Sequence, residues 1–194
     1  MRAWQSAHDW PPSKTPSKRL VESPVDNVLD KTGKTAPRIR AFESFHPGEA
    51  HRSPSLVLDE ARIRDFAELT GDFNPIHLDA EFARRTIHRG VIAHGLLVAA
   101  LSTGMAYGLG LLGENILALE SSQERYLAPV RPGDEIYGTV RIREVDGTAS
   151  RKYGRVKWDT CVFKMIPDRD DVLAMEALWS TLVFKADFIP GARK

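Results

Sequence analysis

One uncharged segment is central to this chain, and it reads Gly95-Leu-Leu-Val-Ala-Ala-Leu-Ser-Thr-Gly-Met-Ala-Tyr107. Its residues are small or apolar at every position, whichever face of a helix they occupy. A helix of this composition is normally buried on all sides. We therefore predict a core helix over residues 95–107 that the rest of the fold surrounds.

The wider uncharged stretch, from Val91 to Gly113, is also long enough to cross a bilayer. Glycines recur along it, Ser102 and Thr103 lie in its middle, and the chain has no second stretch of this kind. Such residues weaken insertion into a membrane. A buried helix of a globular domain is therefore the better interpretation, and we predict no membrane span.

Helix signals precede this segment. Asp59 can cap a helix that runs to about Leu69, and Gly71 can end it in the left-handed conformation. Asp79 can cap a shorter helix over residues 80–85, with Phe82 and Ala83 facing inward. Between the two, Pro75 lacks an amide hydrogen and disfavours helix in the residue before it. We therefore predict an ordered loop over residues 72–79.

Strand signals follow it. Apolar and polar residues alternate over residues 136–143 and 155–162, with turn residues at Pro132-Gly133-Asp134 and Asp146-Gly147. Residues 173–184 are ambiguous, because Leu, Ala, Met and Glu favour helix while the Trp-Ser-Thr-Leu-Val-Phe end favours strand. Helices followed by antiparallel strands indicate the α+β class.

The first 40 residues differ in composition from the rest. They are rich in Pro, Ser, Thr and Lys and have no apolar periodicity, so they cannot bury enough surface to offset the entropy of ordering. They also lack the apolar core of a secretory signal. We predict a disordered or extended tail over residues 1–40 and one folded domain over residues 41–194.

The overall composition excludes several classes of function. Lys and Arg total 27 against 26 for Asp and Glu, a formal net charge of +1 that gives no field for binding nucleic acid or an anionic membrane. Cys161 is the single cysteine, which excludes an internal disulfide and a multi-cysteine zinc site. A single thiol fits a reducing compartment, so we predict a cytoplasmic protein.

Residues that can transfer protons lie in the loop before the core helix. Asp72 and His77 bring a carboxylate and an imidazole to either side of Pro75, and such groups exchange protons near neutral pH. The spacing is equally compatible with an Asp72 that caps local amides and a His77 that is an ordinary loop histidine.

Two further interpretations concern the neighbours of this pair. Asp72, Asn74, His77 and Asp79 carry oxygen and nitrogen ligands, but the glycine and distal Glu of a calcium loop are missing, so we predict no metal. His94 and Gly95 stand where the core helix begins, and free amides at such an end can hold negative charge. A glycine that only permits close packing explains Gly95 equally well.

Two runs together resemble a known signature, Phe66-Ala-Glu-Leu-Thr-Gly-Asp-Phe-Asn-Pro-Ile-His-Leu-Asp79 and Gly90-Val-Ile-Ala-His-Gly-Leu-Leu97. They are similar to the hydratase motif of the MaoC-like, (R)-specific enoyl-CoA hydratase family. The resemblance is dense from about residue 59 to 101 and continues more thinly through Tyr126-Leu-Ala-Pro-Val-Arg-Pro-Gly-Asp134. It implies the hot-dog fold, in which a curved antiparallel sheet wraps a long central helix.

The resemblance also implies roles for residues. Asp72 and His77 would be the catalytic acid/base pair, Gly95 N–H would bind the developing oxyanion, and Asn74 and His94 would support them. The implied reaction adds water reversibly to a trans-2-enoyl-CoA to give an (R)-3-hydroxyacyl-CoA. It needs no cofactor, since CoA is part of the substrate, although an acyl-carrier thioester is an alternative. Exposed basic residues beside the loop are candidates for the pantetheine phosphates, namely Arg84, Arg85 and Arg89.

Hot-dog proteins have other functions, so alternatives remain. One is an acyl-thioester hydrolase, and another is a non-catalytic subunit of a heteromeric dehydratase. The presence of Asp72, Asn74 and His77 together favours the hydratase/dehydratase. The family also implies a homodimer or larger homo-oligomer, in which the sheets of two copies join.

Overall fold

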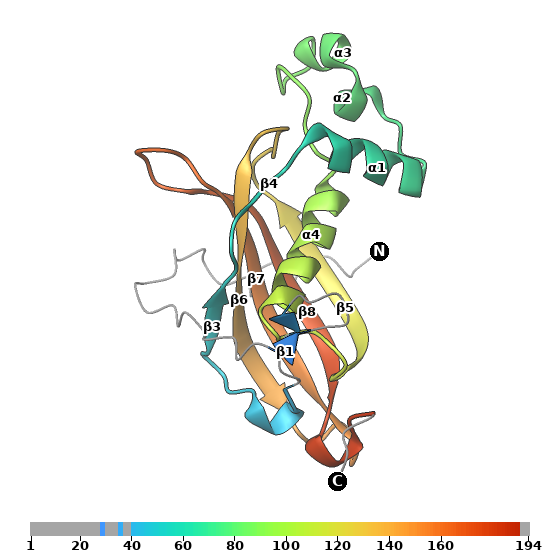
Figure 1. Cartoon of the computed structure of the whole chain (residues 1–194), viewed down its shortest axis with the longest axis vertical. Helices are drawn as coiled ribbons and strands as arrows, with labels where there is room; N and C mark the ends of the chain where they lie inside the picture. Colours follow the sequence, from blue (N-terminus) through green and yellow to red (C-terminus); the bar gives the residue numbers. More distant parts are fainter. Residues whose placement is uncertain (1–27, 30–34, 37–39, 191–194) are drawn as a thin grey trace, which may run out of the picture.

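The computed structural model describes residues 28–29, 35–36 and 40–190, and it consists of a curved antiparallel sheet around one long helix (Figure 1). The predicted tail, residues 1–40, lies almost entirely outside the described residues. Within it, β1 (Val28–Leu29) pairs with β2 (Thr35–Ala36). Disorder of the remaining tail stays a prediction.

The main sheet has six strands in the order β3-β6-β7-β8-β5, with β4 also paired to β6. All pairings are antiparallel. The strands are β3 (Ala50–Arg52), β4 (Leu56–Val57), β5 (Ile116–Tyr126), β6 (Glu135–Asp146), β7 (Tyr153–Lys164) and β8 (Val172–Phe184). Short 3-10 helices, η1 (Phe42–Ser44) and η2 (Ala186–Phe188), lie at the end of the molecule opposite α1 (Figure 1).

Side-chain alternation decides which face of the sheet is buried. In β7 the residues that alternate with charged ones are all buried, namely Val156, Trp158, Thr160 and Val162. The Trp158 ring packs edge-on against Phe45 with 5.2 Å between centroids, and its Nε1–H donates to Thr181 Oγ1 at 2.8 Å. The strand predictions for β6 and β7 are therefore confirmed, as is the turn at Pro132-Gly133-Asp134.

The ambiguous segment is a strand. β8 pairs along its length with β5 on one side and β7 on the other, so hydrogen bonds from two neighbours outweigh its helix-forming residues. β5, which the sequence analysis did not predict, is the edge strand beyond it. Most of its side chains are exposed, and its sequence shows no clear alternation of apolar and polar residues.

The central helix α4 (Gly95–Gly108) lies on the concave face of the sheet, as predicted (Figure 1). Leu97, Val98, Ser102, Met105 and Ala106 are buried against the strands. The prediction that it is buried all round is wrong for the single chain, because a second face is exposed along its whole length: Leu96, Ala100, Thr103, Gly104 and Tyr107. None of the helices among the described residues has the length and apolarity needed to span a membrane.

Three short helices cover the N-terminal end of α4: α1 (Glu60–Thr70), α2 (Pro75–Leu78) and α3 (Ala80–Arg84) (Figure 1). Asp59 caps α1 by accepting from Arg62 N–H, and Gly71 ends it with φ 76°, as predicted. Asp79 caps α3 through two backbone amides. We call residues 59–94, which contain these helices, the overhang.

Two predictions about the overhang are wrong. The predicted loop over residues 72–79 contains α2, because Pro75 stands at its first position, where a missing amide hydrogen removes no helical bond. Asn74 caps this helix by accepting from Ile76 N–H. Phe82 does not face inward, since 38% of it is exposed, and only Ala83 is buried.

Candidate active site at the start of the central helix

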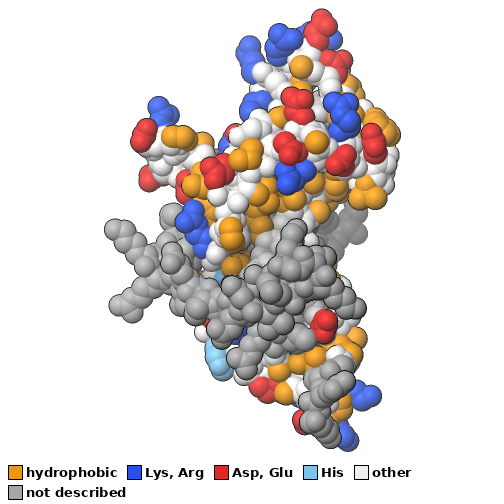
Figure 2. Space-filling model, viewed as in Figure 1, with side chains coloured by type: hydrophobic (Ala, Val, Ile, Leu, Met, Phe, Trp, Pro, Cys, Tyr) orange, Lys and Arg blue, Asp and Glu red, His pale blue; other side chains and the backbone are white. Residues whose placement is uncertain are grey.

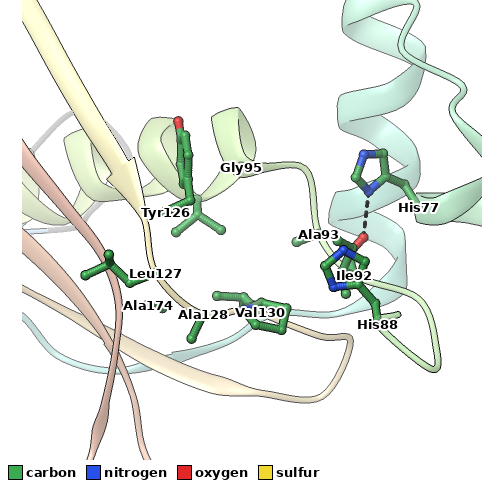
Figure 3. Close-up of a pocket in the computed structure, with 12 residues that line it drawn as sticks. His77, His88, Ile92, Ala93, Gly95, Tyr126, Leu127, Ala128, Val130 and Ala174 are labelled. Atoms are coloured by element: carbon green, nitrogen blue, oxygen red, sulfur yellow. Dashed lines mark hydrogen bonds between the residues drawn. The ribbon is translucent and has the colours of Figure 1, made fainter. Parts of the chain in front are cut away.

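His77 is held by the peptide group of Ile92. Its Nδ1 lies 2.8 Å from the Ile92 carbonyl oxygen, drawn as the dashed line in Figure 3. A carbonyl only accepts, so Nδ1 carries the proton. In neutral His77 this leaves Nε2 as a free lone pair, for which the described residues offer no protein donor.

His94 is almost completely buried beneath His77. Their rings are in tilted contact, with centroids 3.8 Å apart and planes inclined by 32°. His94 Nε2 lies 3.0 Å from the backbone carbonyl of Asp72, so this nitrogen donates. His94 therefore ties the backbone of Asp72 to the start of α4, and its supporting role in the reaction stays a prediction.

Asp72 follows the end of α1 and is exposed in the single chain. Its carboxylate and one nitrogen from each of His77 and His94 lie within 4.8 Å of one another. The Asn74 backbone N–H donates to Asp72 Oδ1 at 3.3 Å, so the interpretation that Asp72 caps local amides is partly correct as well. Asn74 thus bonds to Asp72 through its backbone and caps α2 with its side chain, and its orienting role stays a prediction.

The same three side chains are close enough to be considered as a metal site. Each imidazole donates one N–H to a backbone carbonyl, which leaves the other ring nitrogen with a lone pair that can accept a proton or bind a metal. The prediction of no metal remains a prediction.

The electrostatic setting favours neutral His77. Burial lowers the pKa of His77 below its ordinary value of 6.5, and the neighbouring His94 acts in the same direction. The hydrogen bond to Ile92 and the charge of Asp72 oppose this change in pKa but do not cancel it. His77 is thus set to accept a proton near neutral pH.

A cavity of about 350 Å³ opens beside His77 and Gly95. Figure 3 shows His77 and His88 on one side of it and Tyr126, Leu127 and Ala174 on the other. Asp72 and Asn74 are not among its lining residues. Most of the remaining wall is apolar: Ile92, Ala93, Val98, Ala128, Pro129 and Val130.

Gly95 is the first residue of α4, where backbone amides have no carbonyl one turn earlier to bond with. A Cβ at this position would lie 3.1 Å from two carbon atoms of the Tyr126 ring. Close packing and an accessible amide therefore coexist at Gly95, so the two interpretations from sequence are not exclusive.

The three arginines lie on the overhang and outside the cavity wall. Arg84 donates to Ala80 O at 3.2 Å, Arg85 lies 3.7 Å from Glu81, and Arg89 has φ 58°. Their neighbour His88 does line the cavity. His88 and Tyr126 were not predicted from sequence, and only Tyr126 falls within a run that carries the family resemblance.

Together, the wrapped helix and the cavity at its N-terminal end define a hot-dog protein with a polar site at the helix start. A family model described as "MaoC like domain" matches residues 42–160. The chain therefore belongs to the MaoC-like family, which confirms the recognition made from its motifs.

Similar proteins include enzymes of acyl-thioester hydration. The chain is 39% identical to an (R)-specific enoyl-CoA hydratase of Aeromonas caviae, over 42% of this chain and 60% of that protein. It is 42% identical to a 3-hydroxybutyryl-CoA dehydratase of Methylorubrum extorquens, over 56% of this chain and 67% of that protein.

A solved (R)-hydratase from A. caviae, described as involved in PHA biosynthesis, superimposes with a TM-score of 0.61 at 28% identity. The match covers 73% of this chain and 98% of that one. These relatives confirm the predicted hydratase/dehydratase class at the level of the family.

Proposed function

We propose that this protein reversibly adds water to a trans-2-enoyl thioester and forms an (R)-3-hydroxyacyl thioester. The observation that carries the proposal is the orientation of His77. Its Nδ1 donates to Ile92, so its Nε2 is available beside a cavity that Gly95 also lines, with the Asp72 carboxylate close by.

The cavity supports an acyl thioester as substrate. Its apolar wall suits a hydrocarbon chain, while its two histidines, His77 and His88, lie together at one end and the Tyr126 side chain lies across from them (Figure 3). A few polar groups at one end of an apolar cleft orient a ligand. The thioester would lie at the start of α4 and the acyl chain along Val98 and Ala174.

In the proposed reaction, Asp72 and His77 hold one water molecule next to C3. His77 Nε2 takes a proton from the water as its oxygen bonds to C3, and the electron pair of the C2–C3 double bond moves toward the thioester carbonyl. The proton then passes from Nε2 to C2 on the same face, which leaves His77 neutral again. General acid–base catalysis of this kind contributes roughly 10²–10⁴ in rate.

Gly95 N–H would stabilise the enolate oxygen that forms in this reaction. The amide stands at the positive end of a 14-residue helix, which adds a favourable dipole. Removing one such donor typically costs about 3 kcal/mol of transition-state stabilisation. We also propose that no cofactor takes part, because every step is a proton transfer or a rearrangement of electrons within the substrate.

Whether the substrate is acyl-CoA or an acyl-carrier thioester is part of the proposal, with acyl-CoA preferred. Arg84, Arg85 and Arg89 are candidates to contact its phosphates, because they lie within four positions of His88, which lines the cavity. Replacing all three with Gln should raise the KM for the CoA thioester more than it lowers kcat.

The exposed apolar surface supports the predicted homodimer. Figure 2 shows hydrophobic side chains over the upper part of α4, below the overhang. Leu96 and Tyr107 on α4 are 66% and 55% exposed, and Leu119 on the edge strand β5 is 54% exposed. A second copy that covers this face would bury both features and would lie beside Gly95. The cytoplasmic location remains a prediction.

The alternatives predict different products. A thioesterase would release free thiol from crotonyl-CoA, whereas a hydratase removes the absorbance of the conjugated double bond and releases no thiol. We expect loss of absorbance without thiol, and chiral analysis should find the (R)-product. Thiol release at the same rate would support the hydrolase, and neither signal with any enoyl-CoA tested would support a non-catalytic subunit.

A further inference from the structure

We infer that Arg131 is a positioning residue, whose guanidinium holds the loop that fixes the proton on His77 Nδ1. The inference rests on the proposed function, and it concerns a residue outside the cavity wall. Arg131 lies just before β6, far from His77 in sequence, and the overhang meets the sheet at this point.

Arg131 stands on a rigid turn. Residues 131–134 form a turn in which the Asp134 amide donates to Arg131 O at 3.0 Å, with Pro132 second and Gly133 third at φ 88°. This is the pattern of a type II turn. Asp134 Oδ2 accepts from the Arg131 amide at 2.7 Å and pairs with Lys164 Nζ at 2.7 Å. The backbone of Leu58, which is fully buried, bonds to this turn on both sides.

From this turn the guanidinium reaches the overhang. Arg131 Nη1 donates to Val91 O at 3.3 Å, and Nη2 donates to His88 O. A planar fork can bridge two carbonyls in this way, whereas the single ammonium of lysine cannot hold the same geometry. Gly90 lies between these two residues, and a Cβ there would come within 3.0 Å of Nη1. The guanidinium can approach the backbone this closely because residue 90 has no side chain.

The bridged loop is the one that carries the acceptor for His77. Ile92 directly follows Val91, and its carbonyl accepts from His77 Nδ1 at 2.8 Å. Ala93 N–H donates to Val130 O at 2.7 Å, so the strand side of the loop is also fixed next to Arg131. Without the guanidinium, the loop would keep this bond and the long one from Ile92 N–H to Ile76 O at 3.4 Å, and it would lose both bonds from Arg131.

The consequence concerns which nitrogen of His77 is protonated. Imidazole exists in two neutral forms, and the partner of one nitrogen selects between them. If the Ile92 carbonyl moves, Nδ1 loses its acceptor and the proton also occupies Nε2, where it blocks the lone pair that the reaction needs. A displacement of about 1 Å at such a group can lower turnover by up to about 100-fold.

The test compares Arg131→Met and Arg131→Lys with the wild-type protein. We expect Arg131→Met to lower kcat between about tenfold and 100-fold with a smaller change in KM. The kcat of Arg131→Lys should lie between those of Arg131→Met and the wild-type protein. Nitrogen-15 NMR of the His77 ring, assigned with His77→Gln, should show a protonated Nδ1 in the wild type and a mixture of tautomers in Arg131→Met.

Two more variants separate positioning from general stability. Arg155→Met removes an arginine that bonds Glu120 and Asp146 and has no contact with the loop, so kcat and the His77 spectrum should not change. Gly90→Ala leaves the charge in place and pushes on the guanidinium, and it should produce a weaker form of the same changes in both readouts.

A folded Arg131→Met protein with wild-type kcat and an unchanged His77 spectrum would overturn the inference. If Arg131→Met does not fold, the same two measurements on Arg131→Lys decide. The NMR signature needs no substrate. A wild-type protein without hydratase turnover would therefore refute the proposed function, while the His77 spectrum would still test the role of Arg131.

Discussion

The overhang and the sheet with its central helix are held together by different interactions. Trp158, Ile142 and Val156 are fully buried on the inner face of the sheet, where apolar packing dominates. In the overhang, Leu69, Phe73 and Ile87 are 82%, 59% and 91% exposed. A few residues such as Ile63 and Ala93 anchor it to the core, and helix caps and hydrogen bonds to backbone carbonyls order the rest. Substitutions in the first region should affect stability, and substitutions in the second should affect turnover.

The largest expected effect on turnover comes from replacing Asp72 or His77, the proposed acid/base pair in the overhang. Asp72→Asn and His77→Gln should each lower kcat by about 10²–10⁴, because each removes a group that holds or accepts the proton. Steady-state hydration of crotonyl-CoA measures this, and thermal unfolding should show little change. Asp65→Asn is the matched control, since Asp65 is exposed on α1 in the same region. Wild-type turnover in either variant would end the assignment.

Trp158→Ala in the sheet should show the opposite pattern, with a loss of stability and not primarily of turnover. Loss of a fully buried indole should lower the free energy of unfolding by about 3–5 kcal/mol, and it leaves Thr181 Oγ1 without this donor. Chemical denaturation measures the change. Lys157→Ala, which removes only an exposed ion pair with Glu144, should cost no more than about 1 kcal/mol. Folded Trp158→Ala protein that lost turnover without losing stability would contradict the division between regions.

Gly95→Ala tests the boundary between the two regions. The added methyl would lie 3.1 Å from the Tyr126 ring, tighter than ordinary contact, so the ring or the helix start must shift by a few tenths of an ångström. We expect kcat to fall about tenfold with a loss of stability of about 1 kcal/mol. Gly108→Ala at the other end of α4 has no atom within 4 Å of its new methyl and should retain full turnover. Equal kcat in both variants would argue against a role for Gly95.

The smallest effect concerns pH. The pKa of His77 is lowered by burial, so the imidazole remains neutral to a lower pH than a free histidine does. Activity that needs neutral His77 should fall as pH drops through a midpoint below 6.5. NMR titration of the ring gives the same midpoint directly. In Asp72→Asn the midpoint should move lower still, because the negative charge of Asp72 raises this pKa. A midpoint above 6.5 would show that burial does not dominate.

Several elements of the fold follow from sequence because their interactions are local. Asp59, Gly71 and Asp79 start or end helices through bonds to residues at most four positions away. The alternation in β6 and β7 identifies their buried faces for a similar reason, since neighbouring side chains point to opposite sides. The loop predicted around Pro75 was wrong, because proline also starts helices, and local sequence alone did not distinguish the two cases.

The residues of the site also divide into those that the sequence identified and those that only contacts across the fold revealed. Sequence and family resemblance identified Asp72, His77, Asn74, His94 and Gly95, and the structure places them around the start of α4, although their catalytic roles remain predictions. His88, Tyr126 and Arg131 were not identified, because their importance depends on contacts across the fold. Tyr126 meets Gly95 only where the end of β5 passes the start of α4.

By itself, then, the sequence determined the helix that becomes the core, the caps of the overhang and the chemical groups available for reaction. Only the tertiary structure decided that residues 173–184 form a strand, which nitrogen of His77 carries the proton and which face of α4 stays uncovered. The physical reason is distance along the chain. A cap or a strand face depends on residues a few positions apart, whereas the Ile92 carbonyl and the Arg131 guanidinium bond to partners that lie 15 and at least 40 positions away in sequence.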